Sequence, residues 1–363
     1  MTRKIRKRFP LACLRIGSIH TSSIGHLAHE SDMYLCSEES RNSRWTFWFP
    51  QEHISNEYLF HILSKRLRIT QSYLLKKLYG LGSRSNFLKK LLIANPDCSL
   101  ENRRLLNDKE CVIQLPKSDV RIAHHFLTNF GWKSGQKIVL LCIRDNHFQL
   151  SRDPKSKVQN FRNSSIFDFI PTIEYLCANS FFVIRMGKSS YEKLPAISEN
   201  LIDYPFLEGK SDLLDITLFY LADFVVTTGT GLDQVGEMFR KPILRVNYLP
   251  IGDIMTKNRN YRVLPKQIVD KDTRQVLNLQ EIVSHGLFLA NDDETYEKAG
   301  KIIVSNSPLI ILEEVKVFVE DIKESVGPNS ILQNDFNTYM MSYSGFKIED
   351  VPILSSLWQR NKN

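Results

Sequence analysis

The chain has 363 residues, of which 42% are hydrophobic and 24% charged, and it carries a formal net charge of +8. This length and apolar content are enough for two domains with buried cores, which excludes an intrinsically disordered chain. No run of about 18 apolar residues occurs, so we expect no membrane-spanning helix.

The cysteines and the N-terminus indicate a cytoplasmic protein. The six cysteines show no CxxC spacing, so neither disulfides nor a zinc site is expected: Cys13, Cys36, Cys98, Cys111, Cys142 and Cys177. A basic cluster spans residues 3–8, but the apolar stretch behind it is broken by Arg15 and lacks a signal-peptide cleavage pattern.

The positive charge belongs to the first part of the chain. Residues 1–130 hold 21 Lys and Arg against 11 Asp and Glu, whereas the remainder holds 27 against 29. Between Tyr58 and Pro96 there is no acid, and leucines alternate with the basic residues, which include Lys65, Arg66, Arg68, Lys76, Lys77, Lys89 and Lys90. This pattern predicts either a solvated helix face or a patch for an anionic membrane or acceptor. Nucleic acid is the weaker alternative, because no nucleic-acid-binding motif accompanies the charge.

Residues 1–130 are expected to form an α/β domain. Its strands are predicted at 11–16, 45–49 and 111–115, with a helix over 26–36 and a basic helical region in between.

Residues 131–310 are expected to form a second, more regular domain. Predicted strands at 138–143, 181–184, 224–226 and 243–246 alternate with helices at 166–179, 212–222 and 232–240. This alternation is typical of a parallel, doubly wound sheet. Further helices are predicted at 294–304 and 309–325, and residues 311–363 are expected to pack across both domains.

Polar residues follow three of these strands, at the edge where doubly wound sheets bind ligands. The strand ends carry Arg144-Asp145, then Arg185-Met-Gly187, then Thr227-Thr-Gly-Thr-Gly231. Glycines allow a sharp turn, a helix N-terminus favours an anion, and guanidinium groups bind phosphate through two oxygens. The pattern predicts a site for a nucleotide diphosphate group. The alternative is that Arg144 and Arg185 pair with carboxylates such as Asp145 or Asp203.

Two further features accompany this site. Capping of the next helix accounts for Ser165 and Asp168, but it does not account for Arg162. Glu237 is either a ligand of a ribose hydroxyl or an ordinary exposed helix residue. No metal is expected, since the Asp-x-Asp match at 270–272 lies in a polar, exposed segment.

These motifs, with Ile24-Gly-His-Leu-Ala28 and Asp32-Met-Tyr-Leu35 near the start, resemble a poorly characterised group of bacterial glycosyltransferases of the GT-B type. The resemblance covers most of residues 11–310. It implies two Rossmann-like domains facing a cleft, with the acceptor held by residues 1–130 and the nucleotide-sugar donor by residues 131–310. It also implies terminal helices that cross back to the first domain. The donor-binding residues would be Arg144, Asp145, Arg162, Asn163, Arg185, Gly187, Thr228, Gly229, Thr230, Gly231, Asp233 and Glu237.

The expected function is therefore a metal-independent glycosyltransferase, with a nucleotide sugar as substrate and no cofactor. Its acceptor would be a glycan or glycolipid, reached from the cytoplasm or from the membrane surface. The acceptor hydroxyl needs a base, for which His26 is the first candidate and Glu30 and Asp32 are the alternatives. Two other readings stay open: a nucleotide-sugar epimerase or hydrolase, and a non-catalytic basic binding protein.

Overall fold

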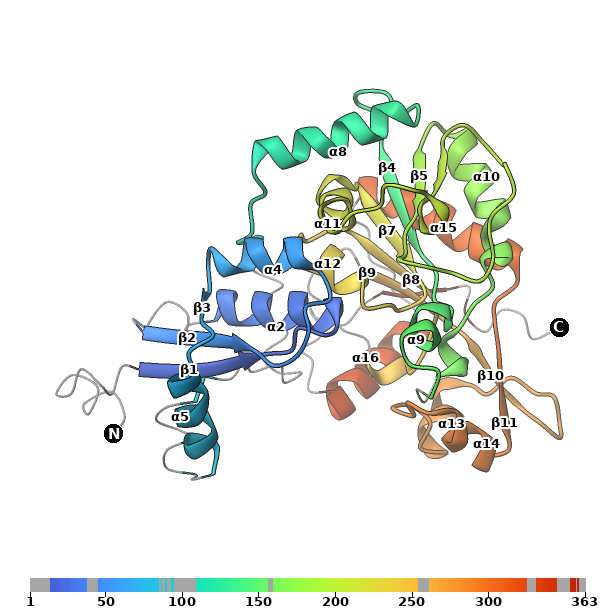
Figure 1. Ribbon diagram of the computed structural model, residues 1–363. Coiled ribbons are helices and arrows are strands. Elements are labelled where there is room, and N and C mark those ends of the chain that lie inside the picture. The colour runs from blue at the N-terminus through green and yellow to red at the C-terminus, as the bar shows by residue number, and fades with distance from the viewer. Residues whose placement is uncertain are drawn as a thin grey trace.

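The computed structural model describes residues 14–37, 45–84, 86, 89, 93–94, 109–155, 159–253, 261–324, 331–344, 353–356 and 358. Two parallel sheets lie side by side, a small one formed by the first part of the chain and a large one formed by the rest (Figure 1). Lys90, the residues before Leu14 and most of the final 20 residues lie outside the described part.

The small sheet has the order β1-β2-β3, from β1 (Leu14–Ile19), β2 (Trp45–Pro50) and β3 (Arg68–Ile69). The connecting helices are α2 (Ile24–Cys36) and α4 (Glu57–Ser64), and α5 (Tyr73–Ser83) follows β3. Gly17 is required in β1, because a Cβ there would lie 2.3 Å from the ring of Trp48.

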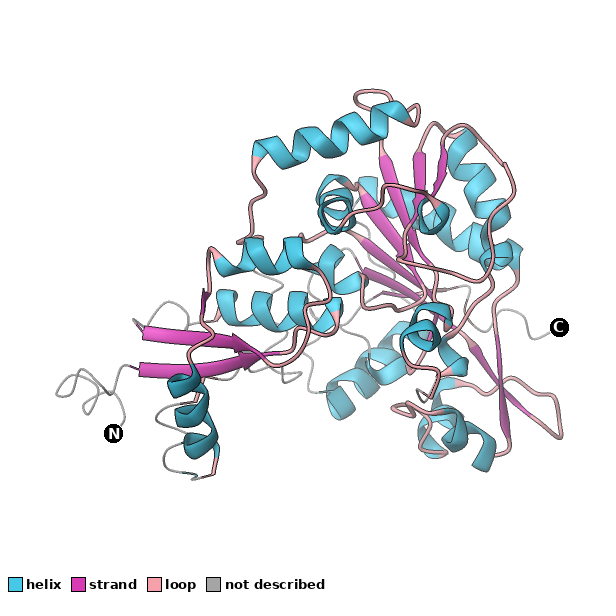
Figure 2. Cartoon of the chain, viewed as in Figure 1, coloured by secondary structure: helices cyan, strands magenta, loops and turns pink. Residues whose placement is uncertain are grey.

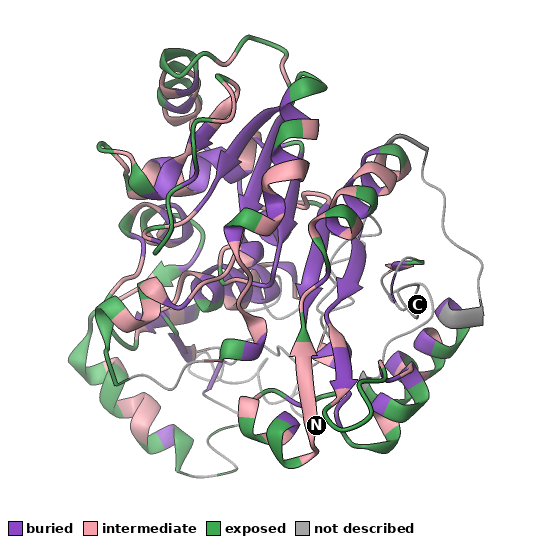
Figure 3. Ribbon diagram, turned by 90° about the vertical axis from the view of Figure 1, so that its right-hand side faces the viewer, coloured by how far each residue is buried: buried purple, intermediate pink, exposed green. Residues whose placement is uncertain are grey.

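The large sheet has the order β12-β9-β8-β7-β4-β5-β6, and all its neighbours pair in parallel. Its strands are β4 (Ile138–Cys142), β5 (Phe182–Arg185), β6 (Leu201–Asp203), β7 (Phe224–Thr227), β8 (Ile243–Tyr248), β9 (Tyr261–Pro265) and β12 (Ile353–Leu354). Every residue of β4, β5, β7, β8 and β9 is buried, as expected for strands covered by helices on both faces (Figure 3). From β6 to β9 the order 6-5-4-7-8-9 reproduces the Rossmann order, with the chain reversing direction between β4 and β7.

Helices cover both faces of the large sheet (Figure 2). The described helices of this part of the chain are α8 (Lys117–Asn129), α9 (His147–Arg152), α10 (Ile170–Ala178), α11 (Asp212–Leu221), α12 (Asp233–Met238), α13 (Leu279–Ser284), α14 (Asp293–Lys298), α15 (Pro308–Glu324) and α16 (Ile331–Ser344). An antiparallel pair, β10 (Gln267–Asp270) and β11 (Lys301–Val304), lies outside this sheet, and 3₁₀ turns occupy Asn160–Arg162, Ile166–Phe169, Tyr204–Phe206 and Ile251–Asp253.

The α/β class and the parallel sheet expected from the sequence are confirmed, with three local differences. Residues 111–115 form no strand, because the alternating Ile113 and Leu115 are buried against helices without a partner strand. The helix expected over 294–304 ends after one and a half turns, where Gly300 takes a positive φ of 66° and β11 begins. The sequence pattern also missed β6 and β9.

The described C-terminal helices α15 and α16 contribute side chains to the core of the large sheet. Ile311, Val315 and Phe318 of α15 complete the core on one face of the large sheet, where α15 packs against α10. Apolar side chains on α15 thus find their burial within the second part of the chain. Among the described residues, no helix is both long and apolar enough to cross a bilayer.

A buried ion pair joins the two parts of the chain where α2 packs against α12. The guanidinium of Arg240 donates to both oxygens of Asp32, at 2.8 and 3.1 Å. Asp32 is 1% exposed, so its buried negative charge is stabilised by these two hydrogen bonds from Arg240. This placement removes Asp32 from the candidates for an acceptor base.

We expect Asp32→Asn to lower the free energy of unfolding by about 3 kcal/mol, because Arg240 would lose its countercharge in a buried setting. Urea unfolding measures the change. Glu294→Gln is the control, since its partner Lys298 is exposed, and it should change stability by less than about 0.5 kcal/mol. Equal effects of the two substitutions would contradict a stabilising role for the pair.

Candidate functional site

The site forms where β4 and β7 lie side by side and the chain departs from them in opposite directions. The segments after these strands are bonded together: the amide of Thr228 donates to the carbonyl of Cys142 at 3.1 Å, and the amide of Arg144 donates to Thr228 Oγ1 at 2.8 Å. Such a reversal leaves a crevice at the carboxyl ends of the strands. Residues that follow all three predicted strands meet here, since Arg144, Gly187 and Thr230 line one cavity.

The glycine turn after β7 needs its glycine at position 229. Gly229 has a φ of +87°, and a Cβ there would lie 2.7 Å from the ring of Tyr248. Gly231, two residues on, contacts the start of α2, since a Cβ on Gly25 would lie 3.0 Å from the Cα of Gly231. The turn therefore touches both parts of the chain.

The start of α12 is not the anion site that the sequence predicted. Asp233 accepts the amide of Thr230 at 3.2 Å and the hydroxyl of Thr227 at 2.6 Å. The amide of Leu232 donates to Thr230 Oγ1 at 3.2 Å. The amides of Thr230 and Leu232 are therefore already hydrogen-bonded and are not available to a phosphate. Asp233, which is 2% exposed, stabilises the turn instead.

Arg144 is the strongest candidate for an anion ligand. No carboxylate pairs with it in the described part of the chain, and its Nε is buried without a hydrogen-bond partner. Burial, reinforced by the nearby positive charge of Arg162, lowers the pKa of Arg144 to about 10. Asp233 and Asp145 oppose this shift without pairing with Arg144, and a bound anion would offset the repulsion between the two guanidinium groups.

Arg162 lies close enough to Arg144 to lower its pKa, and it lines a neighbouring cavity of about 200 Å³ together with Gly229 and Thr230. Its guanidinium donates to the carbonyl of Gly229 at 2.7 Å and to Oε1 of Gln159 at 3.1 Å, both of which are neutral groups. Its Nε is also buried without a partner, and no carboxylate pairs with it among the described residues. The Gly229 carbonyl thus anchors one cation beside the glycine turn.

A cavity of about 290 Å³ lies between the two parts of the chain at this point. The first part contributes residues of the β1 to α2 loop, and the second contributes Arg144 and the turn residues Thr230 and Gly231. Arg152 of α9 closes one side, because it donates to the carbonyl of Ser22 at 3.4 Å and lies 2.6 Å from His53 Nε2. The sequence pattern missed Arg152, since α9 follows no predicted strand end directly.

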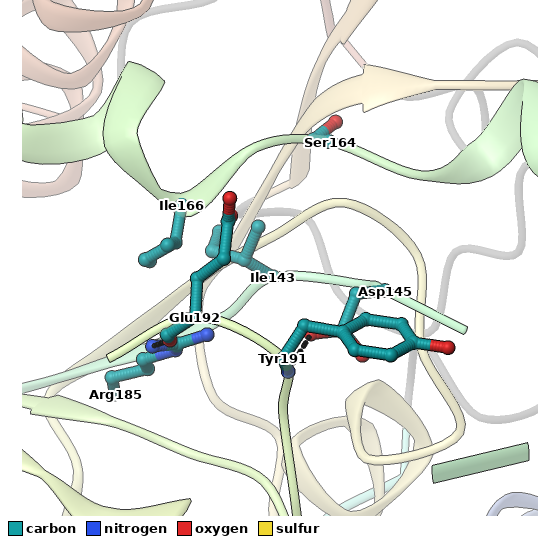
Figure 4. Close-up of a pocket in the computed structure, with 7 residues that line it drawn as sticks. All are labelled: Ile143, Asp145, Ser164, Ile166, Arg185, Tyr191 and Glu192. Carbon is teal, nitrogen blue, oxygen red and sulfur yellow. Dashed lines mark hydrogen bonds between the residues drawn. The ribbon is translucent and has the colours of Figure 1, made fainter. Parts of the chain in front are cut away.

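Arg185 does not join the anion site. It is 2% exposed, pairs with Asp203 at 3.2 Å, and donates to the carbonyl of Glu192 at 2.6 Å and to the hydroxyl of Ser190. Figure 4 shows it against Glu192 at the wall of a neighbouring cavity of about 410 Å³. The alternative weighed from the sequence, a pair with Asp203, is the arrangement found, because a buried guanidinium needs a countercharge.

Glu237 is also placed differently from both sequence interpretations. It is fully buried and pairs with Arg245, whose guanidinium lies 4.8 Å from the ring of Tyr261. Burial alone would lower the pKa of Arg245, but the charge of Glu237, together with Tyr261, Tyr248 and Asp233, outweighs burial and raises that pKa. The pair belongs to the core under α12, so Glu237 is not available to a ribose.

The remaining predicted donor residues shape the loops around the crevice. Asp145 accepts the amides of His147 and Tyr191, at 2.9 and 3.3 Å. Gly187 takes a φ of +149° and lines the cavity between the two parts of the chain. The carbonyl of Asn163 accepts from Lys266, a buried lysine behind the Arg162 loop that the sequence pattern missed.

Two of the three base candidates lie together at the start of α2. His26 is exposed, and its Nδ1 lies 3.3 Å from Oε1 of Glu30. That hydrogen bond raises the pKa of His26, although partial burial opposes it. His20, which the sequence analysis did not select, lies 2.7 Å from the same oxygen.

The predicted basic patch is on the surface. Lys65, Arg66, Arg68, Lys76, Lys77 and Lys89 are all exposed. Lys77 lies 4.8 Å from the ring centre of Tyr73, and Arg68 lies 5.3 Å from that of Trp45. Aromatic side chains therefore accompany the charge.

Comparisons with known proteins identify no family. No family model matches the chain, and no curated protein matches it. Among solved structures, the ADP-heptose LPS heptosyltransferase II of E. coli is 12% identical, with a TM-score of 0.46, over 85% of this chain and 100% of that one. A glycosyl transferase family 9 protein from Veillonella parvula is 8% identical, with a TM-score of 0.46, over 85% and 97%. The E. coli heptosyltransferase WaaC with ADP is 14% identical, with a TM-score of 0.35, over 69% and 93%. Likenesses this distant carry no argument about the site.

Lys266 should make stability depend on pH. Burial lowers its pKa from 10.5 to about 8, although Asp168 and Asp293 oppose the shift. Between these values the unfolded chain holds a proton that the folded chain has released, so stability should rise with pH by up to about 1.4 kcal/mol per unit.

We expect the free energy of unfolding of the wild type, minus that of Lys266→Met, to increase from pH 8 to pH 10.5. Denaturant titrations at intervals across this range measure the difference. A difference that stays constant with pH would contradict a buried lysine with a depressed pKa.

Proposed function

We propose that the protein is a glycosyltransferase that binds the diphosphate of a nucleotide-sugar donor between Arg144 and Arg162. The observation that carries the proposal is that two part-buried guanidinium groups flank the glycine turn at the reversal point of the sheet, and neither pairs with a carboxylate of the described residues. Guanidinium groups in this state suit a phosphoryl ligand, because its oxygens would satisfy both charge and hydrogen bonds. The sugar as the transferred group rests on the resemblance of the sequence motifs.

The reaction divides between the two sides of the cavity. The bond from the sugar carbon to the phosphate oxygen breaks, and Arg144 and Arg162 stabilise the charge that grows on the leaving nucleoside diphosphate. The acceptor oxygen bonds to the sugar carbon and gives its proton to a base. No bound metal is needed at the phosphate under this proposal, because the two cations supply the positive charge there. A GT-B arrangement, with donor on the large sheet and acceptor on the small one, is part of the proposal.

Nucleotide binding tests the phosphate site directly. We expect Arg144→Ala and Arg162→Ala each to weaken binding of a nucleoside diphosphate by about 10- to 100-fold, the usual weight of a charged hydrogen bond. Calorimetry after a thermal-shift screen of nucleotides and nucleotide sugars measures it. Arg121→Ala, an exposed arginine of α8, is the control and should bind as the wild type does. Unchanged affinity in both site variants would contradict the proposal.

Donor turnover separates the glycosyltransferase from the other functions. A transferase should consume the donor only when an acceptor is present, whereas an epimerase or hydrolase would convert it fully alone. A binding protein without activity would consume none under either condition.

We further propose that the acceptor side docks on an anionic membrane surface through α5. This helix turns Leu75, Leu78 and Tyr79 towards the domain and leaves a second stripe open to solvent. Tyr73, Leu74 and Leu81 in that stripe are 71, 66 and 57% exposed. At helical spacing they share one face with Lys77, and no acid lies between residues 58 and 96. An apolar stripe bordered by lysines fits the headgroup region of an anionic bilayer.

Vesicle sedimentation tests this surface. The double variant Leu74→Ser and Leu81→Ser should reduce binding to vesicles that contain phosphatidylglycerol, since it removes the apolar contact while leaving the charge. Leu309→Ser is the control, because Leu309 is 68% exposed on α15 and outside the stripe. The membrane-binding proposal would be contradicted if the wild type, the double variant and Leu309→Ser sediment equally with the vesicles. Binding of the wild type to an oligonucleotide instead of vesicles would also contradict it.

A further inference from the structure

Three potential metal ligands converge where β1 leads into α2. His20 follows β1, while His26 and Glu30 lie one turn apart on α2. Nδ1 of His20 and Nδ1 of His26 lie 2.7 and 3.3 Å from the same oxygen, Oε1 of Glu30. One ligand atom from each side chain lies within 4.8 Å of the other two. Among the described residues, this is the one such group of three or more His, Cys, Asp or Glu side chains.

The spacing of these atoms is close to what a metal ion requires. Zinc binds imidazole nitrogen and carboxylate oxygen at about 2.0–2.2 Å, which places tetrahedral ligand atoms about 3.4 Å apart. Both nitrogen to oxygen distances at Glu30 are at or below this value. The imidazoles of His20 and His26 are 50 and 64% exposed. Rotation of these side chains can therefore bring their two ligand nitrogens to the same separation.

The carboxylate is held in place before any ion arrives. The Glu30 side chain is 12% exposed, and its second oxygen accepts the backbone amide of His20 at 3.4 Å. His26 and Glu30 are four residues apart on one helix, so their relative position is fixed by the backbone. Only the imidazole side of the cluster is open, which leaves room for water as a further ligand.

We propose that His20, His26 and Glu30 form a binding site for one divalent transition-metal ion of the zinc class. Two imidazoles and one carboxylate suit zinc-class ions, whereas magnesium and calcium prefer oxygen ligands alone. Residues 22–24 lie between His20 and His26 in the chain and line the cavity between the two parts of the chain. A bound ion would therefore link this wall of the cavity to the end of β1. His26 and Glu30 are then ligands rather than the acceptor base. No sequence motif indicates this site, because His20 lies in a loop and the three residues match no metal-binding pattern.

Zinc titration of the metal-free, full-length protein tests the proposal. Calorimetry should show one equivalent of Zn²⁺ bound by the wild type, and His20→Ala and Glu30→Gln should each weaken binding at least tenfold. His61→Ala, an exposed histidine of α4, is the matched control and should leave binding unchanged. Thermal unfolding without metal confirms that each variant is folded. If Glu30→Gln fails to fold, His26→Ala replaces it, since that ring is exposed and its loss leaves the carboxylate in place.

Cobalt provides a second readout that does not depend on activity. Co²⁺ should give visible absorption bands typical of low coordination number in the wild type, and these bands should be absent from His20→Ala. Equal Zn²⁺ binding by the wild type and the ligand variants, or no stoichiometric binding by the wild type, would overturn the proposal. Nucleotide binding at Arg144 is measured without metal, so failure of one proposal is distinguishable from failure of the other.

Discussion

Neither Arg144 nor Arg162 pairs with a carboxylate in the part of the chain that the structure describes, and this is the constraint on which the proposed site depends. Burying part of a guanidinium without a countercharge costs stability, and here two such groups lie near each other beside one turn. Two other buried arginines of the same chain do have carboxylate partners: Arg185 pairs with Asp203, and Arg245 pairs with Glu237. The fold thus compensates buried cations elsewhere and leaves this pair to an external anion.

The packing around this pair explains how its position is maintained. The bond from the Arg144 amide to Thr228 locks the end of β4 to the end of β7, and Asp233 fixes the turn from below. The turn also touches Gly25 of α2, and Arg240, just after α12, pairs with Asp32 of α2. The glycine turn and the start of α2 are therefore parts of one packed unit, and the core that includes Leu27 and Val235 is continuous across them.

Much of the architecture could be predicted from the sequence because buried parallel strands read as unbroken apolar runs. That signal located β4, β5, β7 and β8, and the residues that follow them located Arg144 and the glycine turn. Sequence periodicity does not distinguish a charged side chain that is free from one that is paired within the fold. For this reason Arg185 and Glu237 are both predicted as ligand-binding residues. Their partners depend on which strands become neighbours, as when β5 and β6 place Arg185 opposite Asp203. His20, Arg152 and Lys266 were missed for the same reason: each gains its role only from contacts between segments distant in the chain.

A structure of the protein with a bound nucleoside diphosphate would test the central claim most directly. The account predicts phosphate oxygens within hydrogen-bonding distance of the guanidinium groups of both Arg144 and Arg162, at the carboxyl ends of β4 and β7. A nucleotide bound elsewhere, with these two arginines making no contact to its phosphates, would contradict it.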